Sequence, residues 1–183
     1  MAKKALFITS NAGVEQDEFI QPFEFLENKG IEVIHAAEQA QDVRTVKNDK
    51  EQGASYTPHT TLDRVSVEDY DILVIPGGTV NADTLRLNQD AQRIVQYFAD
   101  HAKPIAAICH APWLLINAER VKDKNLTSYK SLKVDLENAG ANWTNEAVKR
   151  CNTGDWVLIT SRCPDDLPQF NAAILKELEN DQT

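Results

Sequence analysis

The sequence predicts an α/β protein built as a doubly wound, mostly parallel sheet with helices on both faces, which makes a three-layer sandwich. Short apolar runs of strand length recur along the chain, and segments with apolar residues at helical spacing lie between them. The runs show no polar alternation, as expected of strands that are buried on both faces. No linker, repeat or low-complexity segment interrupts the pattern, so residues 1–183 are expected to form one domain.

The first elements of the chain predict a βαβ unit, which implies parallel strands and a right-handed crossover. Phe19, Phe23 and Leu26 recur at helical spacing and place a helix between two apolar runs. The predicted elements of this half are a strand at 5–9, a turn at 10–13, a helix that stops at 28–30, a strand at 31–36, and a polar hairpin or surface excursion over 40–68.

The second half repeats the alternation of strands and helices. Ile94, Val95 and Phe98 share one helical face, and Pro112 and Pro168 each suit the first turn of a helix, where a missing N–H is harmless. The predicted elements are a strand at 71–75 that ends in a glycine pair, a helix at 88–101, a strand at 103–108, a helix at 112–117, a helix at 132–139, a strand at 156–161 and a helix at 167–178.

Composition narrows the classes of function. The chain has 28 acidic and 19 basic residues and a net charge of −9, which argues against nucleic acid or an anionic membrane as a partner. No apolar run approaches the ~20 residues of a membrane span. The start leads directly into a strand without a signal peptide, so a cytoplasmic protein is expected. Three widely spaced cysteines and four scattered histidines predict no disulfide framework, no metal site and no cofactor.

Cys109 lies where the strand at 103–108 meets the helix that starts at Pro112. Unpaired N–H groups at a helix N-terminus lower the pKa of a thiol and can hold an oxyanion. This pattern predicts a nucleophile, with His110 as its base. The alternatives are that Cys109 is a small buried hydrophobe and that His110 contributes only its backbone N–H.

Three predicted strand ends are expected to meet in one crevice, because ligands of such sheets bind outside the carboxyl ends of the strands. These ends carry Glu15 and Glu18, then Gly77 and Gly78, then Cys109. Glu18 can hydrogen-bond the sulfur if it is protonated, although an acid here is also favoured simply by the helix dipole. The remaining candidates are interpreted as ordinary residues: His35, His59 and His101 at the surface or at strand ends, Cys151 and Cys163 as inert thiols, and Asp83 and Arg86 as surface charges.

Motifs spread over nearly the whole chain resemble the ThiJ/PfpI superfamily, in particular its intracellular-peptidase-like PfpI branch, in which histidine directly follows the cysteine. The matching segments are Glu15-x-x-Glu18 with Pro22, 69–71 leading into 76–78, 106–112, 126–129, 138–141 and 159–168. The resemblance implies a flavodoxin-like fold of the class I glutamine amidotransferase type.

The resemblance also implies roles for individual residues. Cys109 becomes the nucleophile, Glu18 the acid that hydrogen-bonds it, and the backbone N–H groups of Gly78 and His110 the oxyanion donors. In hexameric members an acid from a neighbouring subunit orients the histidine, and Asp83 matches that position, although its loop is one residue longer. Two further residues are expected to line the pocket: Glu15, and Tyr129, which stands where the deglycase branch has a histidine.

Three functions remain open for a homo-oligomer, dimer or hexamer, of this kind. The first is a deglycase- or glyoxalase-like hydrolase or lyase that acts on small aldehydes or glycated adducts in stress protection. The second is an intracellular cysteine peptidase. The third is a redox-sensing stress chaperone in which Cys109 is oxidised.

Overall fold

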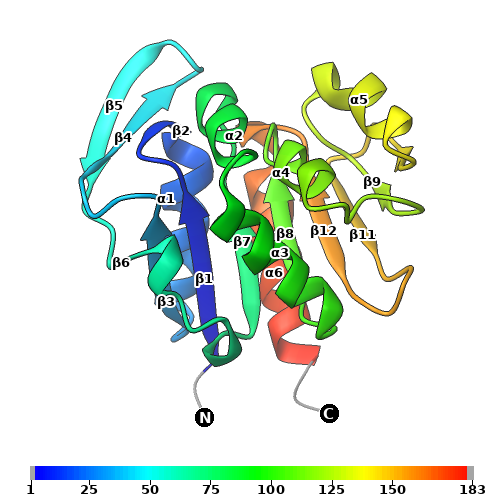
Figure 1. The fold of residues 1–183 in the computed structure, drawn as a ribbon, viewed down its shortest axis with the longest axis horizontal. Helices are drawn as coiled ribbons and strands as arrows, with labels where there is room; N and C mark the ends of the chain where they lie inside the picture. The colour runs from blue at the N-terminus through cyan, green and yellow to red at the C-terminus, as the bar shows by residue number, and fades with distance from the viewer. Residues whose placement is uncertain (1–2, 181–183) are drawn as a thin grey trace.

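A seven-stranded sheet runs through the centre of the computed structural model, which describes residues 3–180 (Figure 1). Its strands, in spatial order, are β11 (Val148–Cys151), β12 (Leu158–Ser161), β8 (Ile105–Ile108), β7 (Ile72–Ile75), β1 (Lys4–Thr9), β3 (Glu32–Ala37) and β6 (Thr60–Thr61). All neighbours pair in parallel except β11 with β12. The predicted doubly wound, mostly parallel sheet is therefore confirmed.

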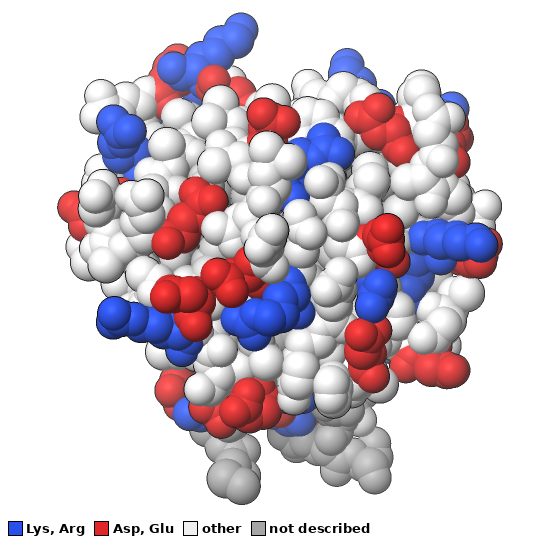
Figure 2. All heavy atoms as spheres, in the orientation of Figure 1, with Lys and Arg blue, Asp and Glu red and all other residues white. Residues whose placement is uncertain are grey.

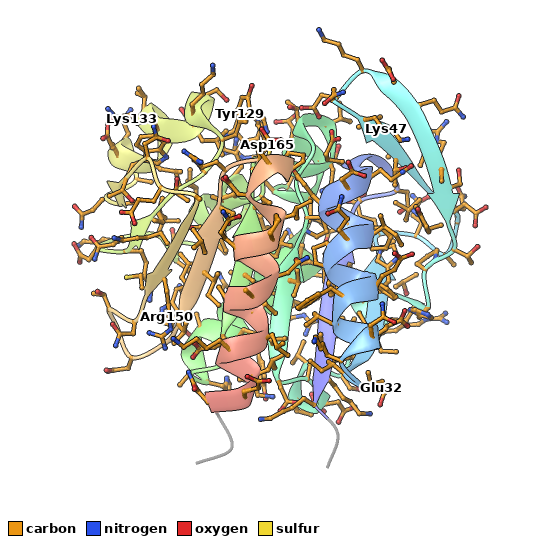
Figure 3. All side chains as sticks on the ribbon, turned by 180° about the vertical axis from the view of Figure 1, so that it is seen from behind. Glu32, Lys47, Tyr129, Lys133, Arg150 and Asp165 are labelled. Atoms are coloured by element: carbon orange, nitrogen blue, oxygen red, sulfur yellow. The ribbon has the colours of Figure 1, made fainter. Side chains whose placement is uncertain are left out.

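Helices cover both faces of this sheet. On one face lie α3 (Gln89–Asp100), α4 (Pro112–Asn117) and α5 (Lys133–Asn138); on the other lie α1 (Gln16–Asn28) and α6 (Leu167–Asn180), which come to the front in Figure 3. Successive residues of β1 alternate between the two layers: Leu6 and Ile8 pack under α3, whereas Ala5 and Phe7 pack under α1 and α6. Because both sides of each strand are buried, the strands read as continuous apolar runs.

The polar segment at 40–68 contains the expected hairpin, formed by β4 (Val43–Lys47) and β5 (Glu51–Tyr56), which projects from the edge of the molecule (Figure 1). The turn predicted at 10–13 is confirmed for Ser10 and Asn11, which join two strands, but is wrong for Ala12 and Gly13, which belong to a short strand, β2 (Ala12–Glu15), that pairs with β4. Neither α2 (Thr79–Leu85) nor β11 is predicted from the sequence. The remaining short elements are two strands and four 3₁₀ helices. The strands are β9 (Asn125–Leu126) and β10 (Asn142–Trp143), and the 3₁₀ helices are η1 (Leu62–Arg64), η2 (Val67–Asp69), η3 (Lys130–Leu132) and η4 (Pro164–Asp166).

The strand order reverses beside β1. From β1 the chain builds the sheet in one direction through β3 and β6, and then in the other through β7, β8 and β12. Such a reversal leaves a crevice at the carboxyl ends of the flanking strands, because the two connections leave in opposite directions. The carboxyl ends of β1, β7 and β8 lie at the upper edge in Figure 1, beside α2 and the β4–β5 hairpin.

His35 departs from its sequence interpretation as a surface or strand-end residue. It lies within β3 with 1% of its surface exposed, and its Nε2 is 2.7 Å from Thr9 Oγ1. Its ring centroid is 4.6 Å from that of Phe19, and its backbone N–H donates to His59 Nδ1. Burial, with a smaller contribution from His59, lowers the pKa of His35 to about 3, so this imidazole is neutral.

The surface carries mixed charge. In the view of Figure 2, acidic and basic side chains are interspersed, and no extended basic patch lies on that face. Within residues 3–180, no helix is both long and apolar enough to cross a bilayer.

Candidate active site

A cavity of about 290 Å³ opens at the carboxyl ends of the central strands. Its lining residues are Glu15, Glu18, Asn48, Asp49, Cys109, Tyr129, Cys163, Pro164 and Asp165. Figure 3 shows Tyr129 and Asp165 at this end of the sheet. The fold thus brings together four predicted site residues, namely Glu15, Glu18, Cys109 and Tyr129, from segments far apart in the sequence.

Cys109 adopts a left-handed backbone conformation, with φ of 64°. For a residue with a Cβ this conformation costs about 1–2 kcal/mol, so the surrounding structure must impose it. Two hydrogen bonds do so: the Cys109 N–H donates to the Ser161 carbonyl at 3.0 Å, and the Cys109 carbonyl accepts from the Tyr129 N–H at 2.9 Å. The sharp turn directs a side chain that is 5% exposed into the cavity, as the strand-to-helix joint predicts.

Glu18 lies in the first turn of α1 and is wholly buried. Its Oε2 accepts a hydrogen bond from the Gly77 N–H at 2.8 Å, whereas its Oε1 has no hydrogen-bond partner among the described residues. Burial raises the pKa of this carboxyl well above its usual value, although hydrogen bonds with the Cys109 side chain and the Gly77 N–H act in the opposite direction; the charges of Glu15 and Asp49 add to the rise. The raised pKa favours the protonated form of the Glu18 carboxyl.

The pKa of the Cys109 thiol differs from the sequence expectation. Burial raises it well above its usual value. Negative charge on Glu18, a hydrogen bond with the Glu18 carboxyl and the charge of Asp49 act in the same direction, whereas the Gly78 N–H lowers it. Two negative charges are not stable side by side in so buried a place. The pair formed by Cys109 and Glu18 therefore keeps one proton. When that proton sits on Glu18, the carboxyl carries no charge against the sulfur and its O–H can donate to a thiolate.

His110 lies directly against the sulfur. Its Nδ1 is 3.1 Å from Cys109 Sγ, and its Nε2 is 3.3 Å from Thr79 Oγ1. The ring stacks on Tyr129 with centroids 4.7 Å apart and meets the Trp113 ring edge to face at 5.3 Å. Burial lowers the pKa of His110, so the imidazole is neutral and can accept a proton.

The glycine pair after β7 supplies backbone donors beside the thiol. The Gly77 N–H binds Glu18, and the Gly78 N–H lies close enough to the sulfur to lower the pKa of the thiol. Gly78 has φ of 94°, and a Cβ built there would collide with the Gly13 carbonyl oxygen. Only glycine allows β7 to end this close to β2.

Glu15 and Asp83 differ in what they contact. The Glu15 carboxylate accepts the N–H groups of Asn48 at 2.9 Å and Asp49 at 3.1 Å, so it fastens the tip of the β4–β5 hairpin over the cavity. Burial raises its pKa, while these two hydrogen bonds lower it. Asp83 is exposed on α2, and its role at a neighbouring subunit stays a prediction.

Six residues at or beside the cavity are not predicted as site residues from the sequence: Asn48, Asp49, Thr79, Cys163, Pro164 and Asp165. The only sequence signal for the first two is that Asn-Asp suits a tight turn. Of the cysteines interpreted as inert, Cys151 is buried away from these lining residues, whereas the half-buried Cys163 lines the cavity. The described residues contain no cluster of three or more side chains suited to a metal ion.

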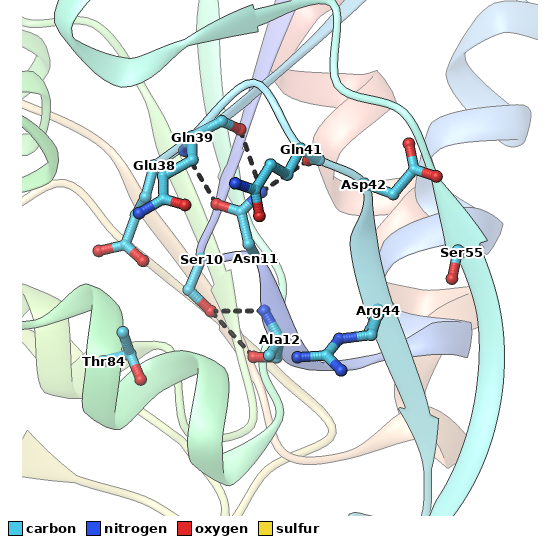
Figure 4. A pocket seen from close by; sticks show the side chains of 10 residues that line it. All are labelled: Ser10, Asn11, Ala12, Glu38, Gln39, Gln41, Asp42, Arg44, Ser55 and Thr84. Atoms are coloured by element: carbon cyan, nitrogen blue, oxygen red, sulfur yellow. Dashed lines mark hydrogen bonds between the residues drawn. The ribbon is translucent and has the colours of Figure 1, made fainter.

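A larger cavity of about 560 Å³ lies between the end of β1 and the outer face of β4 (Figure 4). Its lining residues are Ser10, Asn11, Ala12, Glu38, Gln39, Gln41, Asp42, Arg44, Ser55 and Thr84. The Asn11 side-chain amide donates to the Gln39 and Gln41 carbonyls and joins β1 to the loop after β3. No thiol or imidazole is among its lining residues, whereas Cys109 lines the smaller cavity.

Comparison with known proteins agrees with the fold and the motifs. A model of the DJ-1/PfpI family matches residues 3–177. The chain is 37% identical to protein/nucleic acid deglycase 2 of Escherichia coli over 97% of this chain and 99% of that one. It is also 37% identical to general stress protein 18 of Bacillus subtilis, over 90% of this chain and 92% of the relative. The crystal structure of Drosophila melanogaster DJ-1beta superposes with a TM-score of 0.86 at 30% identity and covers 97% of this chain and 91% of that one.

Proposed function

This chain belongs to the DJ-1/PfpI family, and from that premise we propose that it is a cysteine-dependent enzyme that converts small reactive carbonyl compounds or their adducts. One observation carries the proposal: the Cys109 sulfur lies between a base and an acid. His110 Nδ1 is 3.1 Å away on one side, and the wholly buried Glu18 carboxyl, with one oxygen unpartnered among the described residues, adjoins the other.

The first step is addition to an aldehyde. His110 takes the thiol proton, and the sulfur lone pair forms a bond to the carbonyl carbon while the C=O π electrons move to oxygen. The N–H groups of Gly78 and His110 stabilise the resulting oxyanion, which receives a proton to give a hemithioacetal. The low exposure of Cys109 keeps water from competing for these donors.

A 2-oxoaldehyde substrate allows the sequence to continue without an external cofactor. His110 removes the proton from the carbon bonded to sulfur, and His110 or Glu18 delivers a proton to the neighbouring carbon, which gives a 2-hydroxy thioester. Water then attacks the thioester carbonyl, and the C–S bond breaks to release a 2-hydroxy acid and the free thiol. The net reaction adds one water to the 2-oxoaldehyde.

The cavity favours this function over proteolysis. A volume of about 290 Å³ is at the lower limit of small-molecule sites and gives no extended groove for a polypeptide. The names of two relatives, a deglycase and a general stress protein, support a role in stress protection. Peroxide sensing is the second candidate, since the unpartnered Glu18 Oε1 is placed to hydrogen-bond an oxidised sulfur as well.

Turnover of methylglyoxal by the purified protein tests the proposal, with appearance of lactate measured beside loss of the aldehyde. Cys109→Ala and Cys109→Ser should both abolish lactate formation, because each removes the sulfur. Cys151→Ser is the matched control, since Cys151 is buried away from the cavity. Undiminished turnover in the Cys109 variants, or no 2-hydroxy acid from the parent protein with any small 2-oxoaldehyde, would rule this function out.

A further inference from the structure

A chain of polar contacts continues from His110 away from the sulfur. Thr79 Oγ1 lies 3.3 Å from His110 Nε2 and 2.9 Å from Asp49 Oδ2. The Thr79 backbone N–H also donates to Asp49 Oδ1 at 2.8 Å. Asp49 therefore holds Thr79 through both of its carboxylate oxygens, and Thr79 holds the imidazole.

The direction of each hydrogen bond follows from counting protons. An ionised carboxylate only accepts, so the single Thr79 hydroxyl proton points to Asp49. The Thr79 oxygen can then only accept from His110, which requires the imidazole proton on Nε2. Nδ1 is left unprotonated and faces Cys109 Sγ at 3.1 Å, as a base must. Ser131 Oγ, at 3.5 Å from Nε2, is at the limit of a contact and leaves this assignment unchanged.

We propose that Asp49, acting through Thr79, is the positioning acid that fixes the His110 tautomer and aims its free nitrogen at Cys109. The inference rests on the proposed role of His110 as the base. It assigns the orienting acid to the same chain, whereas the Asp83 prediction requires a neighbouring subunit. One copy of the chain then contains the whole relay, which we define as the contacts that join Asp49, Thr79, His110 and Cys109.

The hairpin that carries Asp49 is held in place for this role. Asn48 and Asp49 form its tip with φ of 53° and 58°, a conformation that Asn and Asp tolerate better than most residues. Glu15 accepts both of their N–H groups, which fixes the tip relative to α1. The buried Glu15 carboxylate thus positions Asp49. Asp49 in turn positions His110 through Thr79.

Few charged groups face His110 from the elements packed against it. Cys109 and Asp49 are the titratable groups in the relay, Tyr129 stacks on the ring face, and Ser131 contributes a hydroxyl. Trp113 covers the ring edge, with Arg86 5.2 Å from the Trp113 ring. Among the described residues, Asp49 is the only charge that shifts the pKa of His110, and it raises that pKa.

Thr79→Val provides the sharpest test, because it removes only the hydroxyl. Valine keeps the shape and the backbone N–H that binds Asp49, so the hairpin anchor remains. Asp49→Asn removes the charge, Thr79→Ser restores a hydroxyl, and Asp83→Asn is the matched control on α2. Ring nitrogen chemical shifts of His110 report the tautomer, and the pH profile of Cys109 alkylation by iodoacetamide reports the base; neither requires a substrate.

The parent protein should show a single tautomer protonated at Nε2. Thr79→Val and Asp49→Asn should give a tautomer mixture and slow Cys109 alkylation at neutral pH about tenfold. Thr79→Ser and Asp83→Asn should behave like the parent. A single Nε2–H tautomer in Thr79→Val, or a tautomer change in Asp83→Asn alone, would overturn the inference. If the parent turns over no methylglyoxal but the shifts follow this pattern, the proposed function fails and the positioning role stands.

Discussion

Acid should destabilise this protein through His35 in particular, and the size of the effect follows from its environment. The pKa of His35 is lowered to about 3 in the folded protein, against about 6.5 in an unfolded chain. Between these two pKa values the unfolded state binds a proton at His35 and the folded state does not. The contribution of neutral His35 to the free energy of unfolding is therefore present above about pH 6.5 and is lost as pH falls toward 3. Between about pH 7.5 and about pH 5 the linkage relation gives a loss of about 2 kcal/mol in the free energy of unfolding.

His35→Gln isolates this contribution. Glutamine places an amide near the position of Nε2 and keeps a hydrogen bond to Thr9, but it does not titrate. Urea unfolding at the two pH values should show that the parent loses about 2 kcal/mol more than the variant. His101→Gln, which removes an exposed histidine, controls for the substitution itself. Equal losses in the parent and in His35→Gln would refute the idea that burial keeps His35 neutral.

Three further predictions concern the site. Gly78→Ala should lower the free energy of unfolding by about 2–5 kcal/mol in urea titrations, because the new Cβ meets the Gly13 carbonyl oxygen and the backbone has positive φ. Gly30→Ala also has positive φ but open space around it, so its free energy of unfolding should fall by less. Glu18→Gln should slow alkylation of Cys109 at mildly acidic pH several-fold, because an amide N–H donates to a thiolate more weakly than a carboxyl O–H does. Because burial lowers the pKa of His110, turnover should be retained as pH falls to about 6.5 and be lost only at more acidic pH.

The central sheet was predictable because its strands are buried on both faces and read as apolar runs. The short elements were not, for two reasons. β2 and α2 contain polar and glycine residues whose structure depends on each other and on β4, which lies about 30 residues further along the chain from β2. β11 has only one buried residue of four, so it lacks the signal that identified β12, its partner.

The candidate site was predictable where backbone geometry dictates it. The strand-to-helix joint at Cys109 and the glycine pair after β7 place the thiol and Gly78 together without knowledge of side chains. Asp49 and Thr79 could not be found in this way, since each looks like an ordinary turn or cap residue until the hairpin folds over α2. The burial of His35 was also hidden, because Thr9 and His59 lie 26 and 24 residues away in the sequence.

The cavity draws its walls from segments between Glu15 and Asp165, so it is one of the last features that a folding chain can complete. Long-range contacts of this kind form late, because closing the intervening loops costs entropy before any contact repays it. An incompletely folded molecule therefore carries a thiol at position 109 whose pKa burial has not yet raised. During refolding from urea, Cys109 reactivity should consequently reach its native value only when folding is complete.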